Sequence, residues 1–130
     1  MQAVYYRSVK AIEPVNEFID QLPPAAQASL DLQIDRLNTL RTTDPPLPFP
    51  HSSQVRGELR ELRCHFGRRL FRVFYQRSGN LFVLLHIIEK KTERLPARDV
   101  EVAQDRWIDF VDRMNALPKR PPRAAGHDAP

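Results

Sequence analysis

The sequence of 130 residues holds a single cysteine, Cys64, and only four glycines. One cysteine cannot close a disulfide within the chain, and the spacing of the four histidines is not that of a metal site. The glycines form neither a phosphate-binding loop nor a dinucleotide fingerprint, and no serine stands in the motif of a hydrolase nucleophile. The sequence therefore predicts no metal site, no cofactor and no covalent serine chemistry.

A long hydrophobic run is also missing. The longest one, Leu81 to Ile88, is interrupted by His86 and is far shorter than the roughly 20 residues that a membrane-spanning helix needs. The chain does not open with a cationic segment followed by an apolar one, which is the pattern that directs secretion. Together with the lone cysteine, these absences predict a soluble protein of the reducing cytoplasm, with no membrane partner.

Length and composition allow one hydrophobic core. A chain of this size with 42% hydrophobic residues can bury one core but is too short for two full domains. The last 13 residues, PKRPPRAAGHDAP, have no apolar periodicity. We therefore expect a single domain over residues 1–117, followed by a disordered, basic and proline-rich tail over residues 118–130.

The first half of the chain predicts one strand, two helices and a loop. Residues 3–9 are rich in β-branched and aromatic types and favour a strand. Apolar residues then follow helical spacing from Pro14 and again over residues 25–41. Residues 42–54 contain four prolines, which exclude a helix or a central strand. We expect this segment to be an extended surface loop.

The second half predicts a small sheet and a closing helix. Strand-forming residues occupy 58–66, 68–76 and 81–89, and turn signals separate them, so the three strands should form an antiparallel meander. Beyond Pro96, apolar residues recur at steps of three and four, which is typical of a helix. The order of elements therefore predicts the α+β class.

Basic residues are concentrated in the predicted sheet. Between Val55 and Arg94 there are ten basic and four acidic residues, an excess larger than the net +4 of the whole chain. A localised positive field of this kind is typical of a protein that binds a polyanion, nucleic acid first. A well-solvated sheet surface would have the same composition, so composition alone leaves both interpretations open.

Strand alternation predicts which charges meet. In the middle strand, Leu70, Arg72 and Phe74 share one face, so the Arg72 guanidinium stands among apolar groups that strengthen its pull on a phosphate. In the preceding strand, Arg60 and Arg63 fall on opposite faces. The two lysines after the last strand cannot both point away from Arg72, so one of them should project over its face.

Three segments together resemble a known family: LRELR at 59–63, RRLFRVFYQ at 68–76 and LFVLLHIIEKKTERLP at 81–96. They resemble the RelE/ParE superfamily of toxins from type II toxin–antitoxin modules, and are most similar to its phage-associated HigB-like branch. The resemblance implies the RelE-like fold, with a strand, two helices, a curved three-stranded antiparallel sheet and a closing helix. It also implies metal-independent, ribosome-dependent cleavage of messenger RNA. The implied partners are the ribosome, the messenger and a helix-turn-helix antitoxin that links the toxin to operator DNA.

The resemblance also assigns roles to single residues. Arg72 matches the arginine that contacts the scissile phosphate, Arg63 the arginine that closes the preceding strand, and Lys91 the basic residue after the last strand, or Lys90 with a shift of one. Four further cations are expected to bind the substrate: Arg60, Arg69, Lys90 and Arg94. Glu61 and His86 are reserve candidates for proton transfer behind Lys91. Each also has a structural interpretation, Glu61 as the partner of an arginine and His86 as a sheet-face histidine with a hydrogen bond.

Two other functions stay open at this point. A tyrosine or histidine that some family members carry near the C-terminus has no clear counterpart here. Its absence favours a non-catalytic inhibitor that binds a protein target such as DNA gyrase, as the ParE branch does. A phage protein that merely binds RNA is the third interpretation.

Overall fold

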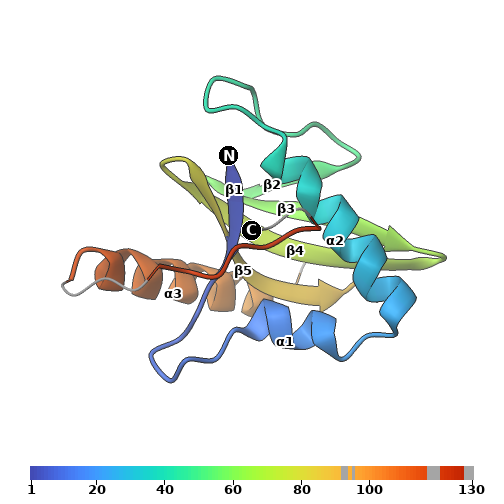
Figure 1. Ribbon diagram of the computed structural model, residues 1–130, viewed down its shortest axis with the longest axis horizontal. Coiled ribbons are helices and arrows are strands. Elements are labelled where there is room, and N and C mark those ends of the chain that lie inside the picture. Colours follow the sequence, from blue (N-terminus) through green and yellow to red (C-terminus); the bar gives the residue numbers. More distant parts are fainter. Residues whose placement is uncertain (92–93, 95, 117–120, 128–130) are drawn as a thin grey trace.

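The structure, a computed structural model, describes residues 1–91, 94, 96–116 and 121–127. Its elements are β1 (Gln2–Tyr5), α1 (Pro14–Asp20), α2 (Pro24–Asn38), β2 (Ser52–Arg56), β3 (Leu59–Phe66), β4 (Arg69–Ser78), β5 (Leu81–Glu89) and α3 (Ala97–Met114). The α+β class is thereby confirmed. Figure 1 shows the layers: α1 and α2 lie on one side of the sheet and α3 lies on the other. No helix among the described residues is long and apolar enough to cross a membrane.

The sheet has five strands in the order β1-β5-β4-β3-β2, and not the three that the sequence predicts. The antiparallel meander of β3, β4 and β5 is confirmed. β1 adds to it in parallel beside β5, a long-range pairing that no local turn signal announces. β2 adds to the other edge and begins within the predicted loop 42–54. The last proline of that loop is Pro50, so the residues after it are free to pair as an edge strand.

Two hydrophobic cores lie on the two faces of the sheet. The core under α1 and α2 includes Leu30, Ile34, Leu37, Val73, Tyr75 and Leu84, and the core under α3 includes Phe74, Val83, Leu85, Val100, Ala103 and Phe110. Neighbouring residues of β4 alternate between the two cores, because successive strand side chains point to opposite faces. α3 packs against β4 and β5, so the face over β3 continues beside this helix.

A β-bulge sets the register at the centre of the sheet. Phe74 pairs with His86 whereas Tyr75 pairs with Leu84, so Leu85 is the extra residue of β5. Leu85 and His86 consequently face the same side, the side of α3, although they are neighbours in sequence. Simple alternation would have placed His86 on the opposite face. The bulge therefore decides which residues at the end of β5 lie on the side of α3.

The end of the chain returns to the sheet. Residues 121–127 run along the outer side of β1, where Ala124 pairs with Val4 and Ala125 is buried (Figure 1). The sequence predicts disorder from residue 118 onward, but residues 123–125 pair with β1 through two backbone hydrogen bonds that no periodicity reveals. Residues 118–120 and 128–130 lie outside the described residues. The division of the chain at residue 117 stays a prediction.

The different burial of two leucines predicts different losses in the free energy of unfolding when each is replaced by alanine. Leu62 in β3 is fully buried, whereas Leu32 in α2 is 56% exposed. Leu62→Ala should lower the free energy of unfolding by about 2–5 kcal/mol, because it removes buried methyl groups and leaves a cavity. Leu32→Ala should change the free energy by less than about 0.5 kcal/mol. Urea denaturation measures both, and equal losses would contradict the assignment of the core.

Candidate active site

The side chains of Glu61, Arg63 and Arg72 meet at the centre of the sheet, on the face that carries α3. Arg63 of β3 and Arg72 of β4 are directly opposite each other in the antiparallel ladder, and Glu61 precedes Arg63 by two residues on the same face. The Nε of Arg72 lies 2.9 Å from Oε2 of Glu61, and Nη1 of Arg63 lies 3.6 Å from its Oε1. Ser53 of β2 donates a hydrogen bond of 3.0 Å to the same Oε1. We call these three charged residues the arginine–glutamate cluster.

Two of the three members of the cluster are buried, which strengthens the electrostatic interactions within it. Arg72 is 8% exposed and Glu61 is 3% exposed, whereas Arg63 is half-buried. Two guanidinium groups facing each other across adjacent strands repel, and the carboxylate of Glu61 offsets that repulsion. Two cations and one anion leave a formal charge of +1. A monoanion such as a phosphodiester group matches that remaining charge.

Several polar atoms of the cluster lack a hydrogen bond. The Nε of Arg72 is close enough to Glu61 for an ion pair, but its N–H is not aligned for a hydrogen bond with Oε2. Among the described residues, Nε of Arg72, Nε of Arg63 and Oε2 of Glu61 are buried with no hydrogen-bond partner. Leaving buried donors and acceptors unsatisfied costs stability, and such atoms in a native protein often serve a ligand. The cluster therefore offers both donors for an oxyanion and a carboxylate acceptor.

An exposed aromatic ring lies beside the cluster. The guanidinium carbon of Arg63 is 5.3 Å from the ring centre of Phe49, which belongs to the proline-rich loop and is 70% exposed. An exposed aromatic ring next to a cation can stack on a nucleobase. Sequence reasoning missed Phe49 and Ser53. An aromatic residue inside a proline-rich loop was the available signal for Phe49, whereas nothing in the sequence marks Ser53.

Three other predicted site cations lie away from the cluster. Arg69 and Lys91 both approach the carboxylate of Glu89, at 2.9 and 3.6 Å. Glu89 pairs with Phe71, so it belongs to the face of α1 and α2. Arg60 lies on that face as well and donates to the hydroxyl of Ser52 and the carbonyl of Leu47. Strand alternation thus separates Arg60, Arg69 and Lys91 from Arg72, and their predicted roles remain untested.

Lys90 is the lysine that strand alternation places on the Arg72 face. Its backbone N–H donates to the carbonyl of Leu70 at 2.7 Å, so the β4–β5 ladder continues one residue beyond the end of β5. Ile88 pairs with Arg72, and Lys90 follows it by two residues. The resemblance matched the family's basic residue after the last strand to Lys91, or to Lys90 with a shift of one residue. Strand alternation favours Lys90. Arg94 is exposed beyond the strand.

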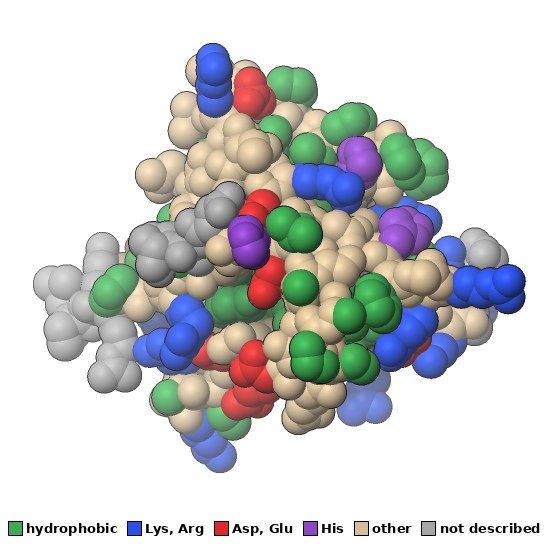
Figure 2. All heavy atoms as spheres, turned by 45° about the vertical axis from the view of Figure 1, so that its right-hand side comes forward, with side chains coloured by type: hydrophobic (Ala, Val, Ile, Leu, Met, Phe, Trp, Pro, Cys, Tyr) green, Lys and Arg blue, Asp and Glu red, His purple; other side chains and the backbone are tan. Residues whose placement is uncertain are grey.

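On the face drawn in Figure 2, lysine and arginine side chains do not form one continuous patch. They stand in several separate places, with carboxylates between some of them. The predicted concentration of positive charge in residues 55–94 is thus divided between two faces and partly neutralised. The candidate site is smaller than the sequence predicts and rests on the arginine–glutamate cluster.

His86 is held by two side chains of α3. Its Nε2 lies 2.7 Å from Oδ1 of Asp99, and its Nδ1 lies 3.0 Å from Nη1 of Arg106. Arg106 can only donate, so Nδ1 must accept and the proton of the neutral ring must be on Nε2, donated to Asp99. Burial lowers the pKa of His86, and the charge of Arg106 lowers it further, while Asp99 acts in the opposite direction. Both ring nitrogens are engaged, which favours the structural interpretation of His86 over proton transfer.

The described residues contain no group of three or more His, Cys, Asp or Glu side chains that could hold a metal ion. The side chains of the cluster itself are two guanidinium groups and one carboxylate. These groups can bind an oxyanion, stabilise developing negative charge and accept a proton.

The comparison with protein families identifies the family of the chain. The model of the family described as phage derived protein Gp49-like (DUF891) matches residues 17–108, more than half of the chain, and the protein belongs to this family. The family belongs to the RelE/HigB-like toxin superfamily and is associated with toxins of toxin–antitoxin modules. A search among curated proteins found no match. The resemblance to the toxin superfamily is confirmed, and the HigB-like branch stays a prediction.

The His86 network predicts a pH dependence of stability. The pKa of His86 is lowered from its ordinary value of 6.5, so the unfolded chain takes up this proton first as the pH falls. Its contribution to the free energy of unfolding is fully present above pH 6.5 and is lost as the pH falls toward the lowered pKa. His86→Gln keeps a donor and an acceptor but does not titrate. Urea denaturation between pH 7 and pH 5 should therefore show a smaller loss of stability for this variant than for the wild type.

The exposed His65 provides the matched control for this measurement. His65→Gln lies outside the network and should keep the wild-type pH dependence. If His86→Gln and the wild type lose stability equally between pH 7 and pH 5, the neutral state assigned to His86 is wrong.

Proposed function

We propose that the protein is the toxin of a type II toxin–antitoxin module and cleaves messenger RNA on the ribosome without a metal, using the arginine–glutamate cluster. The observation that carries the proposal is the buried pair of Arg72 and Glu61 with the half-buried Arg63 beside it, together with the residual positive charge and the unsatisfied donors of this cluster. Membership of a family associated with such toxins supports it. The chain would act in the cytoplasm, where ribosomes and messages are present.

The proposed chemistry uses the 2′-hydroxyl of the RNA as the nucleophile. This oxygen attacks the adjacent phosphorus, a cyclic 2′,3′-phosphate forms, and the 5′-oxygen of the next nucleotide leaves. Arg72 and Arg63 bind the phosphate and stabilise the second negative charge that develops on it. The proton of the 2′-hydroxyl passes to a base, and a proton must reach the leaving oxygen.

Within the arginine–glutamate cluster, Glu61 is the side chain that can accept this proton. Its carboxylate is held by the two arginines and Ser53 in the resting protein. A phosphate that binds the same guanidinium groups competes with Glu61 for them, so the carboxylate becomes free to accept the proton as the substrate arrives. Lys90, which lies on this face by strand alternation, is the proposed cation beside the leaving group, with Arg94 further along the substrate path.

The proposed partners follow from the function. The ribosome and the messenger supply the substrate, and a cognate helix-turn-helix antitoxin neutralises the protein and links it to operator DNA. The exposed Phe49 beside Arg63 would stack on a base next to the cleaved bond.

Arg72→Ala should abolish toxicity in cells, because the phosphate loses a buried guanidinium. After brief induction, mapping of RNA ends should reveal new cleavage sites with the wild type and none with Arg72→Ala. Arg41→Ala is the matched control, since Arg41 is exposed and has no assigned role in the site, and it should cleave like the wild type. Cleavage that persists in Arg72→Ala would overturn the role of Arg72.

A fold control is needed because removing Arg72 leaves Glu61 with one ion-pair partner, which can cost about 3–5 kcal/mol for a buried pair. Arg72→Lys keeps the charge beside Glu61 but loses the planar fork that binds two phosphate oxygens. This variant should melt near the wild-type temperature and still cleave RNA at a rate reduced by at least about tenfold.

Glu61→Gln separates binding from cleavage. Removing the carboxylate charge leaves both arginines available, so the affinity for a non-cleavable RNA carrying a 2′-methoxy group should stay the same or increase. The cleavage rate should fall by roughly 10²–10⁴, the usual contribution of a general base. Fluorescence anisotropy measures the affinity, and single-turnover cleavage on ribosomes measures the rate. An unchanged rate would remove Glu61 from the mechanism.

A second candidate function is inhibition of a protein target without catalysis, as in the ParE branch. Two observations favour it: one carboxylate already pairs with both arginines of the cluster, and both ring nitrogens of His86 are engaged. This function predicts DNA damage with intact messages after induction. The RNA-end map and a DNA-damage reporter, recorded on the same cultures, distinguish the two functions.

A further inference from the structure

The outer edge of β1 is closed by a segment from the far end of the chain. β1 pairs with β5 on one side only, and on its other side the segment Arg123–Ala125 lies antiparallel to it. The N–H of Tyr5 donates to the carbonyl of Arg123 at 2.8 Å, and the N–H of Ala125 donates to the carbonyl of Ala3 at 2.7 Å. This is the hydrogen-bond pattern of a short added strand.

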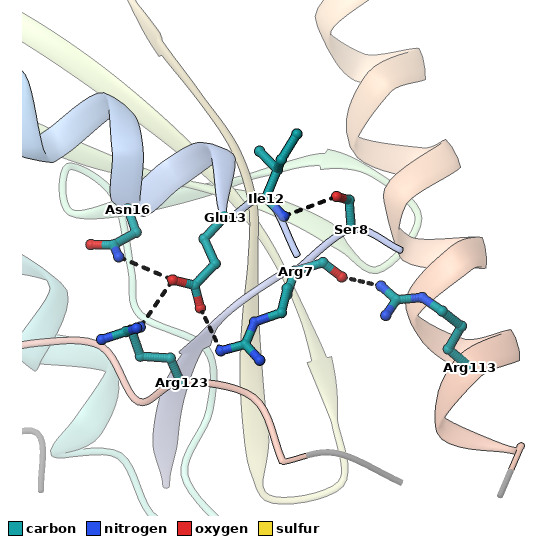
Figure 3. Close-up of polar contacts among 7 residues, drawn as sticks. All are labelled: Arg7, Ser8, Ile12, Glu13, Asn16, Arg113 and Arg123. Carbon is teal, nitrogen blue, oxygen red and sulfur yellow. Dashed lines mark hydrogen bonds and ion pairs between the residues drawn. The ribbon is translucent and has the colours of Figure 1, made fainter. Parts of the chain in front are cut away.

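A buried carboxylate recognises the first residue of this segment. Glu13 is 7% exposed and lies 2.9 Å from Nε of Arg123 and 3.3 Å from a terminal nitrogen of Arg7. Asn16 donates a third contact to it at 3.1 Å. Figure 3 shows the Glu13 carboxylate between these three side chains, with Arg123 approaching from the returning segment. A basic residue at this point of an added strand therefore pairs with a preformed acidic site.

The space around Ala125 and Gly126 limits the size of the residue at each of these positions. Ala125 is 1% exposed within the first core, so a larger side chain has no room there. Its carbonyl accepts hydrogen bonds of 3.0 Å from the side-chain amides of Gln2 and Asn38. Gly126 has a φ of +106°, and a Cβ atom added there would lie 2.3 Å from Oδ1 of Asp35 and 2.4 Å from Nδ2 of Asn38. Only glycine fits this position without a shift.

We propose that the outer edge of β1 is a strand-addition site for a partner protein whose extended segment carries the pattern Arg-x-Ala-Gly. The chain's own residues 123–126 occupy the site and keep it closed. Glu13 selects the basic residue, the core selects the small one, and Asp35 with Asn38 selects glycine. Main-chain hydrogen bonds to an exposed edge supply affinity in this mode of recognition, and side-chain pockets supply specificity.

The resident segment is held in a way that permits exchange. Two backbone hydrogen bonds to β1, two side-chain hydrogen bonds to the carbonyl of Ala125 and one ion pair with Glu13 hold it, and the side chain of Arg123 is 57% exposed. Of residues 121–127 only Ala125 is buried, and a short segment with one buried residue can open locally without unfolding the rest of the domain. A partner segment with the same pattern and additional contacts elsewhere would displace it. The site lies at the β1 edge of the sheet, whereas the arginine–glutamate cluster lies on β3 and β4. The inference therefore does not depend on RNA cleavage.

The test uses the full chain with its resident segment released by Gly126→Ala. Hydrogen exchange followed by NMR should show the amide of Tyr5 exchanging at least about tenfold faster than in the wild type, because the strained alanine lifts the segment from the edge. Adding the peptide PPRAAGH, which is residues 121–127, should restore the protection of Tyr5 in a saturable manner. The amide of Val83 in the centre of the sheet should keep its wild-type protection throughout and report an intact fold.

Peptide variants decide whether the edge recognises the pattern. PPEAAGH and PPRAAAH should each need at least about tenfold higher concentrations to protect Tyr5, since the first meets Glu13 with a like charge and the second carries the clashing Cβ. Equal protection by all three peptides, or unchanged exchange of Tyr5 in Gly126→Ala, would overturn the proposal. Concentration-dependent dimers of Gly126→Ala that protect Tyr5 without any peptide would assign the edge to a second copy, and this also would overturn it.

Discussion

The buried carboxylate of Glu61 is the constraint on which the centre of this molecule depends. Two arginines face each other across neighbouring strands, Arg72 buried and Arg63 half-buried, and like charges that are partly removed from water repel more strongly than they do in solution. Glu61 supplies the anion between them, and Ser53 fixes its orientation from the adjacent strand. The sheet can therefore carry two permanent cations in its interior, which an apolar core alone would not tolerate.

The same constraint shapes the proposed chemistry. In the proposed mechanism the phosphate displaces the carboxylate of Glu61 from the two arginines. Substrate binding therefore also frees Glu61 to act as the base. The charges on the opposite face are more exposed: Arg69 and Lys91 are exposed side chains that share the half-buried carboxylate of Glu89, and water screens their interaction with it. Burial, rather than the number of cations, thus distinguishes the candidate site from the rest of the basic surface. The His86 network joins β5 to α3 at the border of this site and orients the helix beside it.

Much of the fold could be predicted from local patterns. The three helices and the meander follow from periodicity, prolines and turn residues, and the position of Arg72 beside Phe74 follows from alternation. What could not be predicted is long-range: the parallel pairing of β1, the edge strand β2, and the return of residues 121–127 to β1. These depend on which backbone groups meet in space, and the segment PPRAAGH has no apolar periodicity that would announce its pairing with β1. In the site, the sequence prediction placed Arg60, Arg69 and Lys91 together with Arg72. Strand side chains alternate between the two faces of the sheet, and these three residues lie on the face opposite to Arg72.

The bulge opposite Phe74 and Tyr75 has a consequence for the two lysines at the end of β5. With the extra residue Leu85 in place, Lys90 falls on the side of Arg72. In a regular strand the parity would be reversed, and Lys91 would fall there instead. With two consecutive lysines, one ammonium group lies on the side of Arg72 in either register. The positive charge on that side would therefore be kept if β5 gained or lost one residue. With a single lysine, such a change would move the charge to the other face.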